Sequence, residues 1–128
     1  ALERLIHRAN SREAFGKSLS KLGGNPDIIA RARMNIEQAR LLTLKTAWLL
    51  DTKGIGGALS EVSQIKAVVP EMLCTIVDQA IQMHGGGGVS DDHELAAMYG
   101  AARSLRIADG PDEVHRAMVA RLELAKYQ

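Results

Sequence analysis

Apolar residues recur every three or four positions along most of this chain, in runs that end where glycine or proline occurs. Such spacing is typical of amphipathic helices, and a content of only 3% aromatic residues also disfavours strands. The breaks separate five segments that we expect to be helical, at about 1–15, 25–53, 58–84, 92–107 and 111–126. The sequence therefore predicts an all-α fold, an up-down bundle of about four to five helices, in one domain that spans residues 1–128.

The second of these segments carries two apolar stripes. The stripe expected to face the core consists of Ile29, Ala32, Ile36, Ala39, Thr43, Ala47 and Leu50. Met34, Leu41 and Trp48 form the other stripe at seven-residue spacing, on a different side of the helix. This outer stripe indicates a second neighbour, either another chain or another domain. The alternative is that Trp48 covers a local gap.

The charge balance argues against several classes of partner. Lys and Arg number 16, Asp and Glu number 15, and the two signs are interspersed. A nucleic-acid-binding surface needs a basic patch, and a platform for single strands also needs clustered aromatic side chains. No apolar run approaches the ~20 residues that a membrane-spanning helix requires. We therefore expect neither a nucleic-acid partner nor a membrane span.

Cysteine and histidine usage argues against disulfides and metal sites. Cys74 is the only cysteine and lies in an apolar helical pattern, which predicts a buried, unreactive thiol. A di-iron site in a bundle needs Glu-x-x-His from two helices, and only Asp112-x-x-His115 comes near that pattern. We expect no metal site, and the single cysteine favours an intracellular compartment.

Four consecutive glycines, Gly85 to Gly88, are the most unusual feature of the chain. One glycine suffices to end a helix, whereas four leave backbone amides bare for the close approach of a polyanion or a flat ring. Gln82 lies one turn earlier and offers a side-chain amide. The glycine spacing matches neither a Rossmann fingerprint nor a P-loop. The alternative is an ordinary helix end with a flexible turn.

Two further segments could carry chemistry. Arg12 could pair with a phosphate and Phe15 could pack on a ring, or the two could be an exposed arginine and a core phenylalanine. Asp109 lies in the short link before the last predicted helix, where apolar neighbours could shield a carboxylate from water. Asp is also a common helix N-cap, and the residue types alone favour the cap.

In this order and at these separations, the three segments resemble the C-terminal domain of the acyl-CoA dehydrogenase family, over essentially the whole chain. The matching pieces are Arg12-x-x-Phe15-Gly16-Lys17, Gln82-Met83-His84 with the four glycines, and Ala108-Asp109-Gly110. The phrases LLTLKTAWLLDTKG and ADGPDEVH further resemble the branch that contains family members ten and eleven and bacterial relatives.

The resemblance implies a reaction and a role for each segment. The family uses FAD to convert acyl-CoA thioesters into enoyl-CoA, and Asp109 stands where the catalytic base is found, with Gly110 beside the substrate. The FAD contacts carried over to this chain fall at Arg12, Phe15, Gln82, Met83, His84, Gly85, Gly86, Pro111 and Glu113. Much of this contact reaches the flavin of a neighbouring subunit. The resemblance therefore implies a homodimer or homotetramer, and an electron-transfer acceptor as a partner of the full-length enzyme.

This sequence departs from the family's pattern at two places. Most members carry glutamate where Asp109 stands, so the base is one methylene shorter here and the preferred acyl chain stays open. The Arg-Asp pair that usually precedes the catalytic turn is Gly100-Ala101. The family's N-terminal helical domain and middle β domain are absent from these residues, so we expect the chain alone to be inactive. The compartment would be the mitochondrial matrix or peroxisome in a eukaryote and the cytoplasm in a bacterium.

The enzyme interpretation predicts that the glycine turn and Asp109 serve one flavin pocket, completed by other chain segments or by a neighbouring subunit. The alternative function is a helical protein–protein interaction module without catalysis. In that case Gly85 to Gly88 and Asp109 would have no role.

Overall fold

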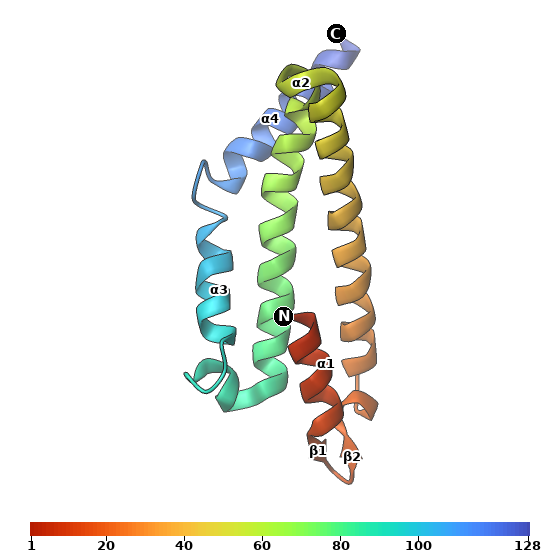
Figure 1. Cartoon of the computed structure of the whole chain (residues 1–128), viewed down its shortest axis with the longest axis vertical. Coiled ribbons are helices and arrows are strands. Elements are labelled where there is room, and N and C mark those ends of the chain that lie inside the picture. Colours follow the sequence, from red (N-terminus) through yellow and green to blue (C-terminus); the bar gives the residue numbers. More distant parts are fainter.

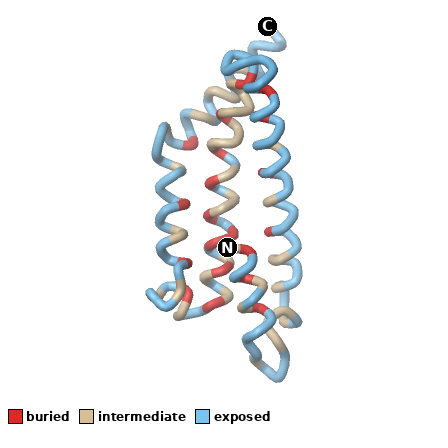
Figure 2. The backbone as a smooth tube through the Cα atoms, viewed as in Figure 1, coloured by how far each residue is buried: buried red, intermediate tan, exposed pale blue.

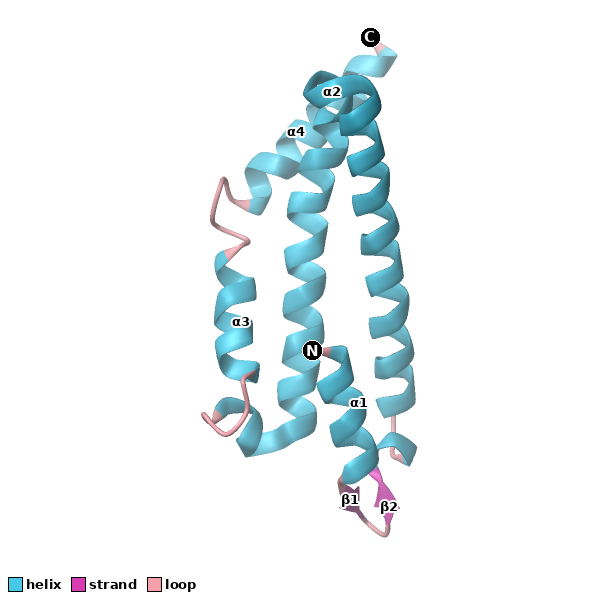
Figure 3. Ribbon diagram, in the orientation of Figure 1, coloured by secondary structure: helices cyan, strands magenta, loops and turns pink.

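The structure, a computed structural model, describes residues 1–128 as a helical bundle with one small hairpin (Figures 1 and 3). The α-helices are α1 (Leu2–Ser11), α2 (Asn25–His84), α3 (Leu95–Ser104) and α4 (Asp112–Leu124). The short elements are the strands β1 (Glu13–Ala14) and β2 (Lys17–Ser18) and the 3₁₀ helices η1 (Leu19–Lys21), η2 (Gly85–Val89) and η3 (Ala125–Tyr127). The predicted all-α bundle is confirmed.

Helix α2 consists of two antiparallel arms joined at Gly54. This glycine has φ 67° and ψ −177°, a combination that is almost exclusive to glycine. The chain reverses there, at the upper end of Figure 1, as the sequence predicted. Helices α3 and α4 follow in sequence and run antiparallel to the second arm, toward the end of the bundle where α2 reverses (Figure 1). Together they lie along one side of the second arm.

The core-facing side of the first arm differs from the predicted stripe in its second half. Ala32 and Ala39 are buried as expected, but Thr43, Ala47 and Leu50 are exposed, and the buried positions are Thr46 and Leu49 instead. Ala32, Ala39 and Thr46 are seven residues apart, a repeat that keeps one seam against a partner helix over a long distance. After Ala39 the predicted stripe advanced by four residues to Thr43 and again to Ala47, and it therefore lay one residue beyond the buried positions Thr46 and Leu49. The Thr46 hydroxyl is satisfied by the Leu42 carbonyl at 2.8 Å.

The second arm of α2 is the central element, and the other helices pack on it (Figure 2). One core cluster joins Leu2 of α1 to Ala32 and Ile76 of the two arms. Another joins Leu5 of α1, Ala80 of the second arm and Leu95 of α3, which are each fully buried. These clusters fix the end of the bundle that carries the hairpin and the glycine turn. Cys74 is buried, as predicted.

None of the helices combines the length and the apolar character needed to cross a membrane.

Candidate functional site

The glycine turn begins where α2 ends, and the requirement for glycine differs from one of its positions to the next. Gly85 has φ 64° and ψ −142°, a conformation that essentially only glycine adopts. Gly88 is buried against the backbone of Ile81, where a Cβ atom has no room. Gly86 is exposed, and a Cβ atom there would meet no other atom within 4 Å. Only part of the run is therefore explained by packing, and Gly86 leaves its backbone open to close approach.

His84 faces into the protein rather than toward this open backbone. Its side chain is buried, and Nδ1 donates a hydrogen bond to the carbonyl oxygen of Ala80 at 2.7 Å. Its ring meets the ring of His93 edge to face, with centroids 4.7 Å apart. A cofactor contact at His84 would therefore have to use its backbone, because the imidazole is already engaged.

The segment of Arg12 and Phe15 is a β-hairpin, and the prediction that the first helix reaches Phe15 is wrong. Arg12 ends α1 with extended dihedral angles, and its carbonyl accepts a 2.9 Å hydrogen bond from the Leu19 amide. Phe15 and Gly16 have φ 53° and 74° and form the two-residue turn between β1 and β2 (Figure 3). Phe15 is 96% exposed at this tip, so the interpretation as a core phenylalanine is also wrong.

A shallow pocket lies between the segment after the hairpin and the end of α2. Its lining residues are Leu19, Asn25, Ile28, Asp78, Gln79, Gln82 and Met83. Asn25 closes one side by donating a 2.8 Å hydrogen bond to the Leu19 carbonyl. Gln82 is exposed here, whereas Met83 also packs against the core cluster of Leu5. Two of the three predicted segments therefore share one end of the bundle (Figure 1).

The third segment, around Asp109, is a strained link between α3 and α4. Asp109 is exposed with φ 55°, a left-handed conformation that is uncommon for residues other than glycine, although Asp and Asn adopt it most readily. Its side chain does not cap α4, because Pro111 is the N-cap residue and no side-chain cap bond is present. The interpretation of Asp109 as a helix cap is therefore wrong. Glu113 lies exposed in the first turn of α4, close to this link.

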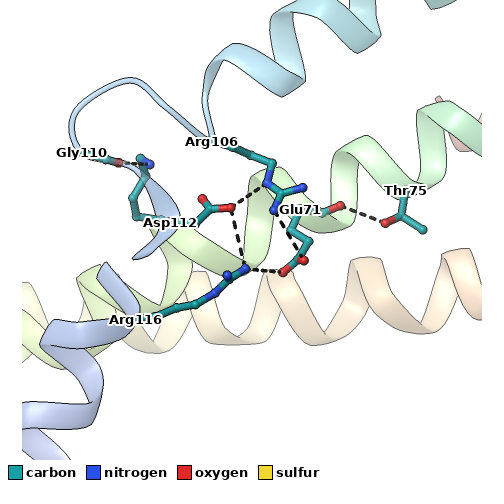
Figure 4. A network of polar contacts seen from close by, with 7 residues as sticks. Glu71, Thr75, Arg106, Gly110, Asp112 and Arg116 are labelled. Carbon is teal, nitrogen blue, oxygen red and sulfur yellow. Dashed lines mark hydrogen bonds and ion pairs between the residues drawn. The ribbon is translucent and has the colours of Figure 1, made fainter. Parts of the chain in front are cut away.

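A network of ion pairs holds both ends of the link (Figure 4). Arg106 Nε donates to Asp112 Oδ2 at 2.6 Å, and the Asp112 amide donates back to the Arg106 carbonyl at 3.2 Å. The hydrogen bond from Asp112 raises the pKa of the Arg106 guanidinium above its usual value, although partial burial opposes this. Arg116 lies 3.8 Å from the same Asp112 oxygen and 3.3 Å from Glu71 of α2.

Sequence reasoning did not find this network. A usable signal exists, since Arg106 and Asp112 carry opposite charges and flank the Asp109 link on either side. The Asp112 side chain is only 3% exposed, and a buried carboxylate requires a partner.

The glycine turn and the Asp109 link lie at opposite ends of α3 (Figure 1). The ten residues of α3 correspond to about 15 Å along the helix axis. The expectation that both converge on one pocket is therefore not met by the folded chain alone. An extended ligand or a second copy of the chain would be needed to connect them.

Comparison with known proteins identifies the family. Residues 1–124 match the family model described as the C-terminal domain of acyl-CoA dehydrogenase. A Mycobacterium abscessus protein assigned to the acyl-CoA dehydrogenases has a solved structure that is 60% identical, with a TM-score of 0.98 over 99% of this chain and 31% of that one.

Two animal proteins extend the comparison to the branch expected from the sequence. Acyl-CoA dehydrogenase family member 11 of Gallus gallus is 52% identical over 97% of this chain and 16% of its own length. Family member 10 of Mus musculus is 50% identical over 97% of this chain and 12% of its own length. The chain thus spans between 12% and 31% of the length of these three relatives. It belongs to the acyl-CoA dehydrogenase family and corresponds to the C-terminal helical domain of that family.

Proposed function

We propose that this chain is the C-terminal domain of an FAD-dependent acyl-CoA dehydrogenase, which converts acyl-CoA thioesters into α,β-unsaturated enoyl-CoA. The observation that carries the proposal is the state of Asp109. Its backbone has a φ of 55°, and its side chain is exposed and has no partner within the chain. A carboxylate without a partner, on a backbone of defined conformation, is available to accept a proton.

Asp109 would remove the proton from the carbon next to the thioester carbonyl. FAD, when bound, supplies the acceptor for the hydride that leaves the neighbouring carbon. Aspartate is one methylene shorter than glutamate, so the acyl chain must approach the backbone of this link more closely. Gly110 suits that approach, since it has no side chain and its φ of 97° is one that L-residues avoid.

The other end of the bundle fits the ADP portion of FAD. Gly86 is bare on its outer side, and the exposed Arg12 offers a guanidinium that can bind two oxygens of a diphosphate. Phe15 presents an uncovered ring that can stack on adenine, and Gln82 and Met83 line the adjacent pocket. We propose that these residues hold FAD together with the backbone of His84 and Gly85. Pro111 and Glu113, near the base, would contact the cofactor at its other end.

The separation of these two ends supports a contribution from more than one subunit. The glycine turn of one copy would contact the flavin that the Asp109 of another copy serves. The outer stripe of the first arm offers a surface for such association, because Met34, Leu41 and Trp48 are each more than half exposed. We therefore propose a homodimer or homotetramer. In this arrangement the chain without the family's other two domains would lack turnover, and an assay of the 128 residues with acyl-CoA and an electron acceptor tests this.

The decisive experiment is the substitution Asp109→Asn in the full-length protein that carries this domain. Asparagine keeps the shape of the side chain but cannot accept the proton. We expect turnover of acyl-CoA to be lost while bound FAD is retained, and we expect the control Asp51→Asn, at an exposed position in α2, to behave like the parent protein. Unchanged turnover in Asp109→Asn would remove Asp109 as the base.

A further inference from the structure

The link that carries Asp109 receives one hydrogen bond from a distant part of the chain. Lys66, in the second arm of α2, donates from Nζ to the carbonyl oxygen of Gly110 at 2.8 Å, across 44 positions of sequence. A peptide carbonyl cannot turn without changing the dihedral angles beside it. This bond therefore fixes the plane of the Gly110–Pro111 peptide, one peptide bond beyond that of Asp109.

The other hydrogen bonds of the link are local, and most of them lie at its two ends rather than near Asp109 and Gly110. The ends are closed locally, by the Ala108 amide on the Ser104 carbonyl at 2.9 Å and by the Arg106–Asp112 pair. In the middle, the Asp109 carbonyl accepts a longer bond of 3.2 Å from His115 Nε2 of α4, the helix that directly follows the link. Lys66 is the residue that ties the middle of the link to the central helix.

The surroundings of Lys66 favour its hydrogen bond to the Gly110 carbonyl over an ion pair. Its side chain is partly buried, and no carboxylate lies within ion-pair distance of it, whereas the exposed Lys45 and Lys126 each have such a partner. It lines a largely apolar groove with Thr43, Val62, Ile65, Val69 and Pro70. An ammonium group in such a position is satisfied by bonding a carbonyl oxygen, and here the available carbonyl is that of Gly110.

We infer that Lys66 is a positioning residue for Asp109: it holds the left-handed backbone from which the carboxylate projects toward the substrate. The inference rests on the proposed function, because it assigns Lys66 to the same reaction. A displaced base would slow proton removal and leave the acyl-CoA and FAD contacts intact, so the effect should fall on kcat and spare KM.

The test compares three variants of the full-length protein. In Lys66→Met, a side chain of similar length without the donor, we expect kcat per bound flavin to fall by roughly 10- to 100-fold, with KM, flavin content and melting temperature near those of the parent protein. Lys66→Arg, which keeps the charge and the donor, should stay within a few-fold of the parent. The matched control is Lys45→Met on the same helix, which should leave kcat unchanged.

Two results would overturn the inference. One is a Lys66→Met enzyme with the parent kcat, and the other is an equal loss in Lys66→Met and Lys66→Arg. Rates are taken per bound flavin, so a poorly folding variant does not imitate a catalytic defect. Asp109→Asn is measured in parallel. If it is inactive while Lys66→Met is fully active, only the role of Lys66 fails, whereas activity in Asp109→Asn rejects the proposed base itself.

Discussion

Gly88 packs so closely on Ile81 that a Cβ atom added to Gly88 would lie 2.5 Å from the Ile81 carbonyl oxygen and 2.8 Å from its Cα. These are backbone atoms, which cannot rotate away as the end of a side chain would. Gly88→Ala should therefore reduce the free energy of unfolding by about 1–3 kcal/mol, as overpacking in a core does. Urea denaturation measures the loss.

The matched control for this substitution is Gly86→Ala, because Gly86 has the open space that Gly88 lacks. Its effect on stability should stay within about 0.5 kcal/mol. The same substitution should weaken FAD retention in the full-length protein, since the methyl group occupies the open face of the turn. Equal stability losses in both variants would contradict this division of the glycine run.

Phe15 should matter for the cofactor and hardly at all for the fold. Its ring is 96% exposed at the tip of the hairpin, so Phe15→Ala removes no packing within the chain. We expect a change in the free energy of unfolding within about 0.5 kcal/mol, compared with about 2–5 kcal/mol for Leu5→Ala in the core. FAD retained after gel filtration should fall in the full-length Phe15→Ala protein. Full retention of FAD would argue that nothing stacks on this ring.

The ion pair between the arms of α2 should give a measurable pH dependence. Lys45 Nζ lies 3.0 Å from Glu61 Oε1, and this contact holds the pKa of Glu61 below its usual value of 4.5, although partial burial opposes it. Because the folded pKa is the lower one, the stabilisation is complete above the unfolded value and is lost as the pH falls through the folded value.

Lys45→Met should accordingly lower the free energy of unfolding at neutral pH by about 0.5 kcal/mol, a modest amount because the lysine is largely exposed. The difference from the parent protein should shrink as the pH falls below the usual glutamate value of 4.5 and through the lower folded pKa of Glu61, because Glu61 then becomes neutral. Urea denaturation at a series of pH values checks this. A difference that stays constant over the series would show that the pair itself is not responsible.

The outer stripe should control association. Trp48 is 58% exposed and Leu41 is 65% exposed on the first arm, and burying such side chains between copies is favourable. Replacing both with glutamate should reduce the molar mass of the full-length protein in sedimentation or light scattering. Leu124→Glu is the control, because Leu124 is similarly exposed at 64% but lies on α4. An unchanged mass in the double variant would mean that the stripe contacts something other than a second copy.

The sequence predicted best those features that depend on neighbouring residues. The reversal at Gly54 and the end of α2 at Gly85 follow from the freedom of glycine, which is a local property. The hairpin was missed because its turn uses Phe15, a residue type that seldom adopts a positive φ, and because each strand has only two residues. The apolar ring at position 15 fitted a helical pattern although no core lies next to it.

Features that depend on residues far apart in sequence could not be derived from the pattern. The bond from Lys66 to Gly110 requires knowing which face of α2 meets the link before α4. The residue type favours Asp109 as a helix cap because Asp often caps helices, yet the N-cap residue of α4 is Pro111, two residues later. The relative placement of the glycine turn and Asp109 depends on the direction of α3, which residue spacing alone does not give.

Because α3 is continuous, its number of residues sets the distance and the relative rotation between the glycine turn and the Asp109 link. Inserting one residue into a helix rotates everything beyond it by about 100° and advances it by about 1.5 Å, while a full turn adds about 5.4 Å. Either change would alter the position of Asp109 relative to the backbone amides of the glycine turn. Exposed residues of this helix can therefore be substituted with less consequence than a residue can be inserted into it.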